Sequence, residues 1–148
     1  MITQTQSPII EIVSRGIAPF IQLFGIYVFF HGHYGPGGGF QGGVLLAAGV
    51  LLLRMSMGAV PSQAQVSSKI TIAICALGAL IFAGTGLVTL LYGGDFMDYH
   101  YLPFPGLEAA DLRYYGILLI ELGIVMAVMT GLIAIYDDLL GINHAGNS

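Results

Sequence analysis

The sequence predicts an all-α integral membrane protein with four transmembrane helices and a glycine-rich loop between the first and the second. Three observations predict this fold class. The 148 residues are 56% hydrophobic and 8% charged, with a mean hydropathy of +0.86. Average soluble domains carry about 25% charged residues, so this chain lacks the charges to cover a water-facing surface. Its apolar residues form four runs, and a hydrocarbon core of about 30 Å needs about 20 apolar residues per helix.

The chain is short enough that four spans leave little over. We therefore expect a single membrane domain over residues 1–148, with the lipid bilayer as its solvent. The expected spans cover about 9–31, 40–60, 70–92 and 114–136. The net charge of −4 argues against nucleic acid as a partner, and the one cysteine, Cys75, excludes an intrachain disulfide.

The first span begins with a helix-start signal, because Ser7 suits an N-cap and Pro8 suits the first helical position. Glu11 precedes Arg15 by four residues, the favourable order for an ion pair on one helix face. We favour an interfacial pair in which the Arg15 side chain reaches toward water. Pro19 is expected to kink this helix or loosen its hydrogen bonding.

Residues 32–43 form the glycine-rich loop around which the chain is organised. Glycine adopts positive φ readily and allows backbones to approach closely, so the composition indicates a shaped, packed loop. A second span that starts at Val44 would be short, so the loop is expected to dip into the membrane. The residues of this structural motif are Gly32, His33, Pro36, Gly37, Gly38, Gly39, Phe40, Gln41, Gly42 and Gly43.

Small residues at helical spacing predict where the helices pack, because lipid offers no hydrophobic drive for helix pairing. Gly43 and Ala47 form such a pair in the second span. The expected seam of the third span is Cys75, Ala79, Ala83 and Gly86, and that of the fourth span is Gly116, Gly123 and Thr130.

Glu121 lies inside the fourth predicted span. Carboxylates at membrane depth are costly and usually face protein or water, so Glu121 marks either an ion or proton path or a polar helix contact. It lies roughly opposite the small seam of its own helix. We therefore expect this helix to have neighbours on two sides. Four helices hardly supply them, which points to a larger complex.

His31 and His33 could join a proton relay or seed a metal site, but packing in the loop or at the interface is the favoured interpretation. The glycines at 37, 39 and 42 formally match a dinucleotide fingerprint, but membrane spans flank them instead of a βαβ unit. No catalytic pairing of side chains is visible, so we expect no enzyme activity, no cofactor and no metal.

Basic residues set the expected orientation. Arg15, Arg54 and Lys69 fall on one side of a four-span chain and Arg113 on the other. This places both termini in the cytoplasm. The glycine loop and the aromatic, acidic connection 93–113 then face the outer side, and the role of that connection stays open.

The glycine motif resembles the signature of the MnhB family, the B subunits of the multisubunit cation/proton antiporters of the Mrp, or Mnh, type. Ser7-Pro8, Arg15 and Pro19 are also similar to that family's first helix, and the resemblance covers residues 7–55. It implies an accessory subunit of a sodium/proton antiporter complex in the cell membrane, with the other subunits as partners and without catalytic chemistry of its own. Ion movement is assigned mainly to larger subunits in that family.

Two alternatives remain open. Similar subunits occur in membrane-bound hydrogenases and related ion-pumping redox complexes. From a different class, the two small seams permit a small self-associating channel or membrane anchor.

Overall fold

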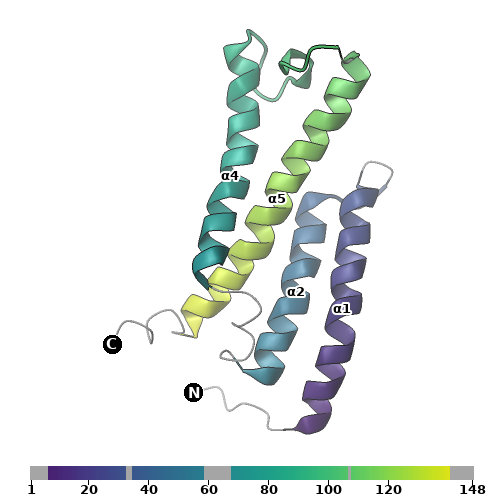
Figure 1. The fold of residues 1–148 in the computed structure, drawn as a ribbon, viewed down its shortest axis with the longest axis vertical. Coiled ribbons are helices and arrows are strands. Elements are labelled where there is room, and N and C mark those ends of the chain that lie inside the picture. The colour runs from purple at the N-terminus through teal and green to yellow at the C-terminus, as the bar shows by residue number, and fades with distance from the viewer. Residues whose placement is uncertain (1–6, 33–34, 59–67, 107, 141–148) are drawn as a thin grey trace.

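The computed structural model describes residues 7–32, 35–58, 68–106 and 108–140. Four long helices and one short 3-10 helix make up the fold, and no strand occurs among the described residues. They are α1 (Pro8–His31), α2 (Gly39–Met57), α4 (Ser68–Leu91), η1 (Tyr99–Tyr101) and α5 (Ala109–Leu139) (Figure 1). All four long helices are apolar and long enough to cross a membrane, which confirms the predicted fold class.

The four helices lie side by side in one layer, in the spatial order α4, α5, α2, α1 (Figure 1). The glycine loop joins α1 and α2 into one antiparallel hairpin, and the connection that carries η1 joins α4 and α5 into another. Contact between α2 and α5 holds the two hairpins together. Only 22% to 39% of the most apolar window of each helix is buried, so most of the apolar surface faces outward from the layer.

α5 is the central helix and contacts a neighbour on each side. On one side, a Cβ at Gly78 of α4 would lie 2.5 Å from the Gly123 carbonyl oxygen. On the other, a Cβ at Gly43 of α2 would lie 3.1 Å from the Val125 carbonyl oxygen. The expectation that four helices hardly supply two-sided packing was therefore wrong, because the single-layer arrangement gives α5 both neighbours within the chain.

The seam of α4 agrees with the predicted one only in part. Gly86 is buried and the Cys75 thiol lies 3.5 Å from the Ala127 carbonyl oxygen of α5. Ala79 and Ala83 are exposed, whereas threonines and glycines occupy the buried face. Thr85 Oγ1 donates to the Ile81 carbonyl at 2.7 Å, so its polar group is satisfied inside its own helix. A threonine bonded in this way packs as a small side chain. The buried positions of α4 are Thr71, Gly78, Thr85, Gly86 and Thr89.

The contact between α2 and α5 has an apolar middle and a charged end. Ala47, Val50 and Ile133 form the core cluster, with Leu51 and Met129 packed against it. Small residues of α2 allow this close approach. The interface therefore joins the hairpins by packing along most of its length.

The two hairpins are staggered along the direction of the helices. α2 begins at Gly39, which packs on Glu121, and Arg54 near its end pairs with Asp137. α2 thus lies along the second half of α5. At 1.5 Å per residue, α5 starts about 18 Å before the level of Glu121. The α4–α5 hairpin accordingly extends well past the glycine loop (Figure 1).

The connection between α4 and α5 folds over the ends of both helices. The Tyr99 ring lies against Gly116, where an added Cβ would be 2.7 Å from the ring. Burial raises the pKa of the Tyr99 hydroxyl above its ordinary value. α5 then begins at Ala109, inside the predicted connection 93–113. A helix can continue past the apolar run because exposed Asp111 and Arg113 face outward in its first turns.

Candidate functional site

The glycine loop folds tightly onto the end of α1. Gly32 ends that helix and donates its N–H to the Phe29 carbonyl at 3.3 Å. Gly38 donates to the Val28 carbonyl at 3.2 Å and accepts from the Gly42 N–H at 2.9 Å. Gly38 has φ of +114°, a conformation that favours glycine. The loop therefore returns directly into α2 without a spacer.

Close contacts explain why side chains are missing at several loop positions. A Cβ at Gly32 would lie 2.5 Å from the Gly38 Cα, and one at Gly39 would overlap the Glu121 carbonyl oxygen. At Gly42 it would lie 2.9 Å from the Phe29 Cβ. These glycines bring α1, α2 and α5 together at one place.

Glu121 lies within this contact. A Cβ placed at either Gly32 or Gly38 would be 3.1 Å from its Oε1 atom, and its Oε2 atom is buried. Gly38 is the N-cap of α2, and the first turn of this helix contains no acidic residue. Glu121 of α5 instead brings a carboxylate to this end of α2. Helix N-termini carry partial positive charge that favours an anion. The Glu121 carboxyl group therefore lies near the partial positive charge of this helix end.

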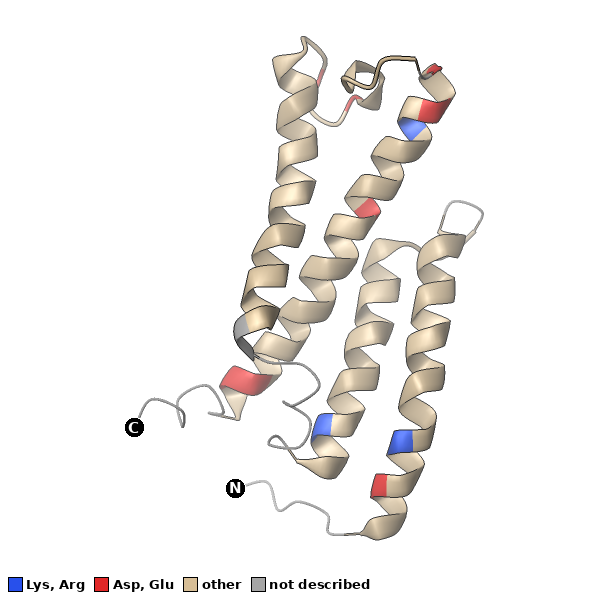
Figure 2. Ribbon diagram, in the orientation of Figure 1, with Lys and Arg blue, Asp and Glu red and all other residues tan. Residues whose placement is uncertain are grey.

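Figure 2 shows how this position stands apart. Among the described residues the charges gather near the helix ends and in the connections, apart from one acidic position within the length of α5 (Figure 2). That position is Glu121. Sequence reasoning singled out the glycine motif and Glu121 separately, and the structure brings them together.

The remaining motif residues have different surroundings. Phe40 and Gln41 are exposed on the first turn of α2, whereas Gly43 is buried against α5. Pro36 and Gly37 belong to the return of the loop, where Pro36 is exposed and a Cβ at Gly37 would meet the Val28 carbonyl at 2.7 Å.

The two histidines are not described equally. The His31 ring is exposed at the end of α1 and stacks on Tyr27, with ring centroids 4.7 Å apart. His33 lies outside the described residues. No group of three or more metal-ligating side chains occurs in the described part of the chain.

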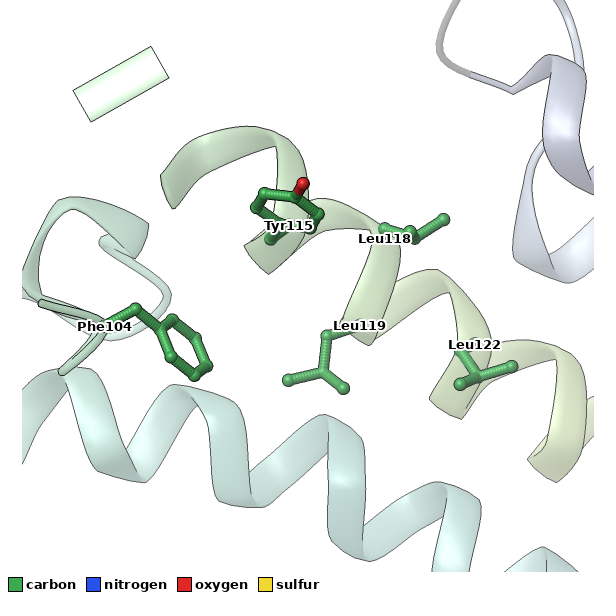
Figure 3. A pocket seen from close by; sticks show the side chains of 5 residues that line it. All are labelled: Phe104, Tyr115, Leu118, Leu119 and Leu122. Carbon is green, nitrogen blue, oxygen red and sulfur yellow. The ribbon is translucent and has the colours of Figure 1, made fainter. Parts of the chain in front are cut away.

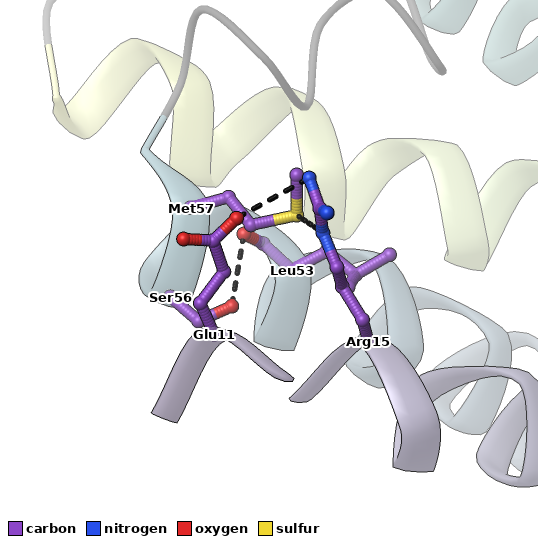
Figure 4. Close-up of polar contacts among 5 residues, drawn as sticks. All are labelled: Glu11, Arg15, Leu53, Ser56 and Met57. Atoms are coloured by element: carbon purple, nitrogen blue, oxygen red, sulfur yellow. Dashed lines mark hydrogen bonds and ion pairs between the residues drawn. The ribbon is translucent and has the colours of Figure 1, made fainter. Parts of the chain in front are cut away.

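Glu11 and Arg15 lie near the start of α1, at the end opposite the glycine loop. Figure 4 shows their side chains beside Met57. Arg15 Nη2 is 3.2 Å from Glu11 Oε1, and Arg15 Nε is 3.4 Å from the sulfur of Met57 on α2. Both charged side chains are substantially exposed, at 44% and 58%. Such exposed pairs contribute little stability, about 0–1 kcal/mol.

A second ion pair escaped sequence reasoning. Arg54 of α2 pairs with Asp137 of α5, and both side chains are fully buried. Arg54 lies within the expected span 40–60, and α2, which ends at Met57, contains it. The pair spans 83 positions of sequence. The sequence did contain a signal for this pair. The chain has few charges, and Arg54 and Asp137 were both expected on the same side of the membrane.

An apolar groove of about 450 Å³ lies on the first half of α5. Figure 3 shows Tyr115, Leu118, Leu119 and Leu122 of α5 around it, with Phe104 of the preceding connection (Figure 3). Among the described residues that line it, the Tyr115 hydroxyl is the one ionisable group. The groove has the character of a packing surface.

Comparison with known proteins identifies the family. Residues 9–134 match the domain described as related to the MnhB subunit of Na⁺/H⁺ antiporter. A Staphylococcus haemolyticus protein named as a putative mnhB2 antiporter subunit is 31% identical over 90% of this chain and 94% of its own length. The B subunit of the Na⁺/H⁺ antiporter from Bacillus subtilis is 27% identical over 85% of this chain and 92% of its own length. The chain therefore belongs to the MnhB family.

Proposed function

We propose that this chain is an accessory subunit of a multisubunit Na⁺/H⁺ antiporter complex in the cell membrane. The match to the MnhB domain and the names of its relatives support this assignment. In this proposal the four long helices cross the bilayer, both termini face the cytoplasm, and the other subunits of the complex are the partners. The chain contributes to assembly and forms one wall of an ion or proton path.

The single-layer fold is the observation that carries the accessory role. α1 and α4 lie at opposite edges of the layer, so the four helices of one copy do not surround a pore. An ion path beside this layer needs its other wall from another subunit. Intramembrane carboxylates commonly mark such paths. Glu121 is then the group of this chain that faces or supports the path, at the contact of the glycine loop with α5.

Purification tests the assembly part of the proposal. The tagged chain, extracted from its native membrane in mild detergent, should bring along large polytopic antiporter subunits identified by mass spectrometry. Hydrogenase or iron–sulfur partners would instead favour a redox complex. A homo-oligomer without other subunits would contradict the accessory role.

Substitution of Glu121 tests whether this residue belongs to the ion or proton path. In everted vesicles that contain the complete complex, Glu121→Gln should leave the complex assembled and lower Na⁺/H⁺ exchange by about tenfold or more, since the carboxylate is lost and the shape retained. Glu108→Gln is the matched control, because Glu108 is exposed at the start of the same helix. Unchanged exchange in Glu121→Gln would remove Glu121 from the path and leave it a structural contact.

A further inference from the structure

A second groove opens between α1 and α2 beside the glycine loop. Its volume is about 460 Å³. The lining includes Phe24 and Val28 of α1, Pro36 of the loop, and Phe40, Gln41 and Val44 of α2. Gln41 is the polar side chain in this apolar lining. It is exposed, and its amide makes no hydrogen bond with another described residue.

The position of Gln41 along α2 places its amide at membrane depth. Gln41 lies seven residues from the middle of α2, or about 10 Å at 1.5 Å per residue. The half-thickness of the hydrocarbon core is about 15 Å. The stagger of the hairpins places the start of α2 near the middle of α5, which brings Gln41 still closer to the bilayer centre.

Lipid is the wrong neighbour for this groove. An acyl chain offers no hydrogen-bond partner, so an amide facing it leaves two donors and one acceptor unsatisfied. The loop beside the groove also needs hydrogen-bond partners, because Gly35 and Pro36 expose non-helical backbone. Such backbone is tolerated at membrane depth against protein or a water-filled cavity.

We propose that this groove receives a transmembrane helix of a neighbouring subunit, and that the helix hydrogen-bonds the Gln41 amide. The inference rests on the proposed function, which supplies the neighbouring subunits. The fitting partner is an apolar helix with a hydroxyl, an amide or a small residue that exposes a backbone carbonyl at this depth. Side-chain hydrogen bonds of this kind join helices within membranes. The aromatic walls formed by Phe24 and Phe40 would pack on its flanks.

Photo-crosslinking in the complete complex tests this contact. A benzophenone amino acid replaces Gln41 in the tagged chain, with all subunits produced together in the native membrane. The control carries the same group at Leu80, which is 68% exposed near the middle of α4 and lies away from the groove. Irradiation should join position 41 to one other subunit, with clearly lower yield of that product from position 80.

A second variant separates the amide from the shape of the groove. Gln41→Leu introduces an apolar side chain of similar size that cannot form the hydrogen bonds, whereas Gln41→Asn keeps an amide. Co-purification of the crosslinked subunit should fall about fivefold in Gln41→Leu, the loss expected of one interhelical hydrogen bond, and recover in part in Gln41→Asn.

The possible results distinguish failure of the proposed contact from failure of the proposed function. Crosslinks at position 41 to lipid alone, or to a second copy of this chain, would overturn the proposed contact, as would undiminished co-purification of Gln41→Leu. If the unmodified chain assembles with antiporter subunits in the same preparation, only this inference fails. If the unmodified chain brings along no other subunit, the proposed function fails with it.

Discussion

At the scale of single residues, two ion pairs among the described residues have the same chemistry in opposite surroundings. Arg54 and Asp137 are fully buried between α2 and α5, whereas Glu11 and Arg15 share an exposed turn of α1. Removing one partner of a buried pair leaves an uncompensated charge, while an exposed charge remains solvated. The two pairs therefore allow burial to be tested with matched chemistry.

We expect Asp137→Asn to lower the free energy of unfolding by about 3–5 kcal/mol, because it removes the carboxylate that pairs with the buried Arg54 guanidinium. Glu11→Gln should change it by less than about 1 kcal/mol. Thermal unfolding of the purified complex in detergent, followed by size-exclusion profile, measures both. Replacing both members of the buried pair with apolar residues should recover much of the loss. Equal effects of Asp137→Asn and Glu11→Gln would contradict the buried geometry.

At the scale of elements, the packing of α2 depends on glycines that differ in their surroundings. A Cβ at Gly39 would overlap the backbone of α5 at Glu121, so the whole helix would have to move. A Cβ at Gly35 would meet nothing within 4 Å. The glycine count of the loop thus overstates how many positions need glycine.

Gly39→Ala should displace α2 from α5 and destabilise the chain by about 1–3 kcal/mol, the usual cost of overpacking. Gly35→Ala should stay within about 0.5 kcal/mol of the unmodified chain. The fraction of chain that survives detergent extraction as an assembled complex after graded heating measures the difference. Equal tolerance at positions 35 and 39 would argue against close contact of α2 with Glu121.

The sequence patterns predicted the number of helices but not every packed face. Apolar run length was enough for four helices, because crossing a bilayer imposes length and composition on each segment separately. Ala79 and Ala83 were placed wrongly on the packed face of α4, because small size at helical spacing was the criterion and the threonines were not considered. The bonded hydroxyl of Thr85 makes it a small packing residue, and Ala83 is exposed.

At the scale of the whole molecule, the sequence did not reveal the axial register between the two hairpins. Glu121 and the glycine motif were both visible in the sequence, yet their meeting depends on α2 packing along the second half of α5. The Arg54–Asp137 pair depends on the same register, across 83 positions. Local periodicity specifies which face of a helix packs, but not the axial register between helices.

The register also predicts unequal depth for the two loops on one side of the layer. α5 begins about 18 Å before the level of Glu121, where the glycine loop lies. A bilayer that contains the apolar length of α4 and α5 therefore leaves the start of α5 near the surface and the glycine loop below it. A probe restricted to the outer aqueous phase should distinguish the two levels.

The probe is a membrane-impermeant maleimide applied to intact cells, with Cys75 first replaced by serine. Glu108→Cys, at the exposed start of α5, should react rapidly from outside. Gly35→Cys should react at least about tenfold more slowly, because at membrane depth the loop faces protein or confined water. Reaction of Glu108→Cys only after permeabilisation would instead reverse the proposed orientation. Equal rates at the two positions would mean that the glycine loop reaches the surface, and that α1 and α2 cross the bilayer at the same height as α4 and α5.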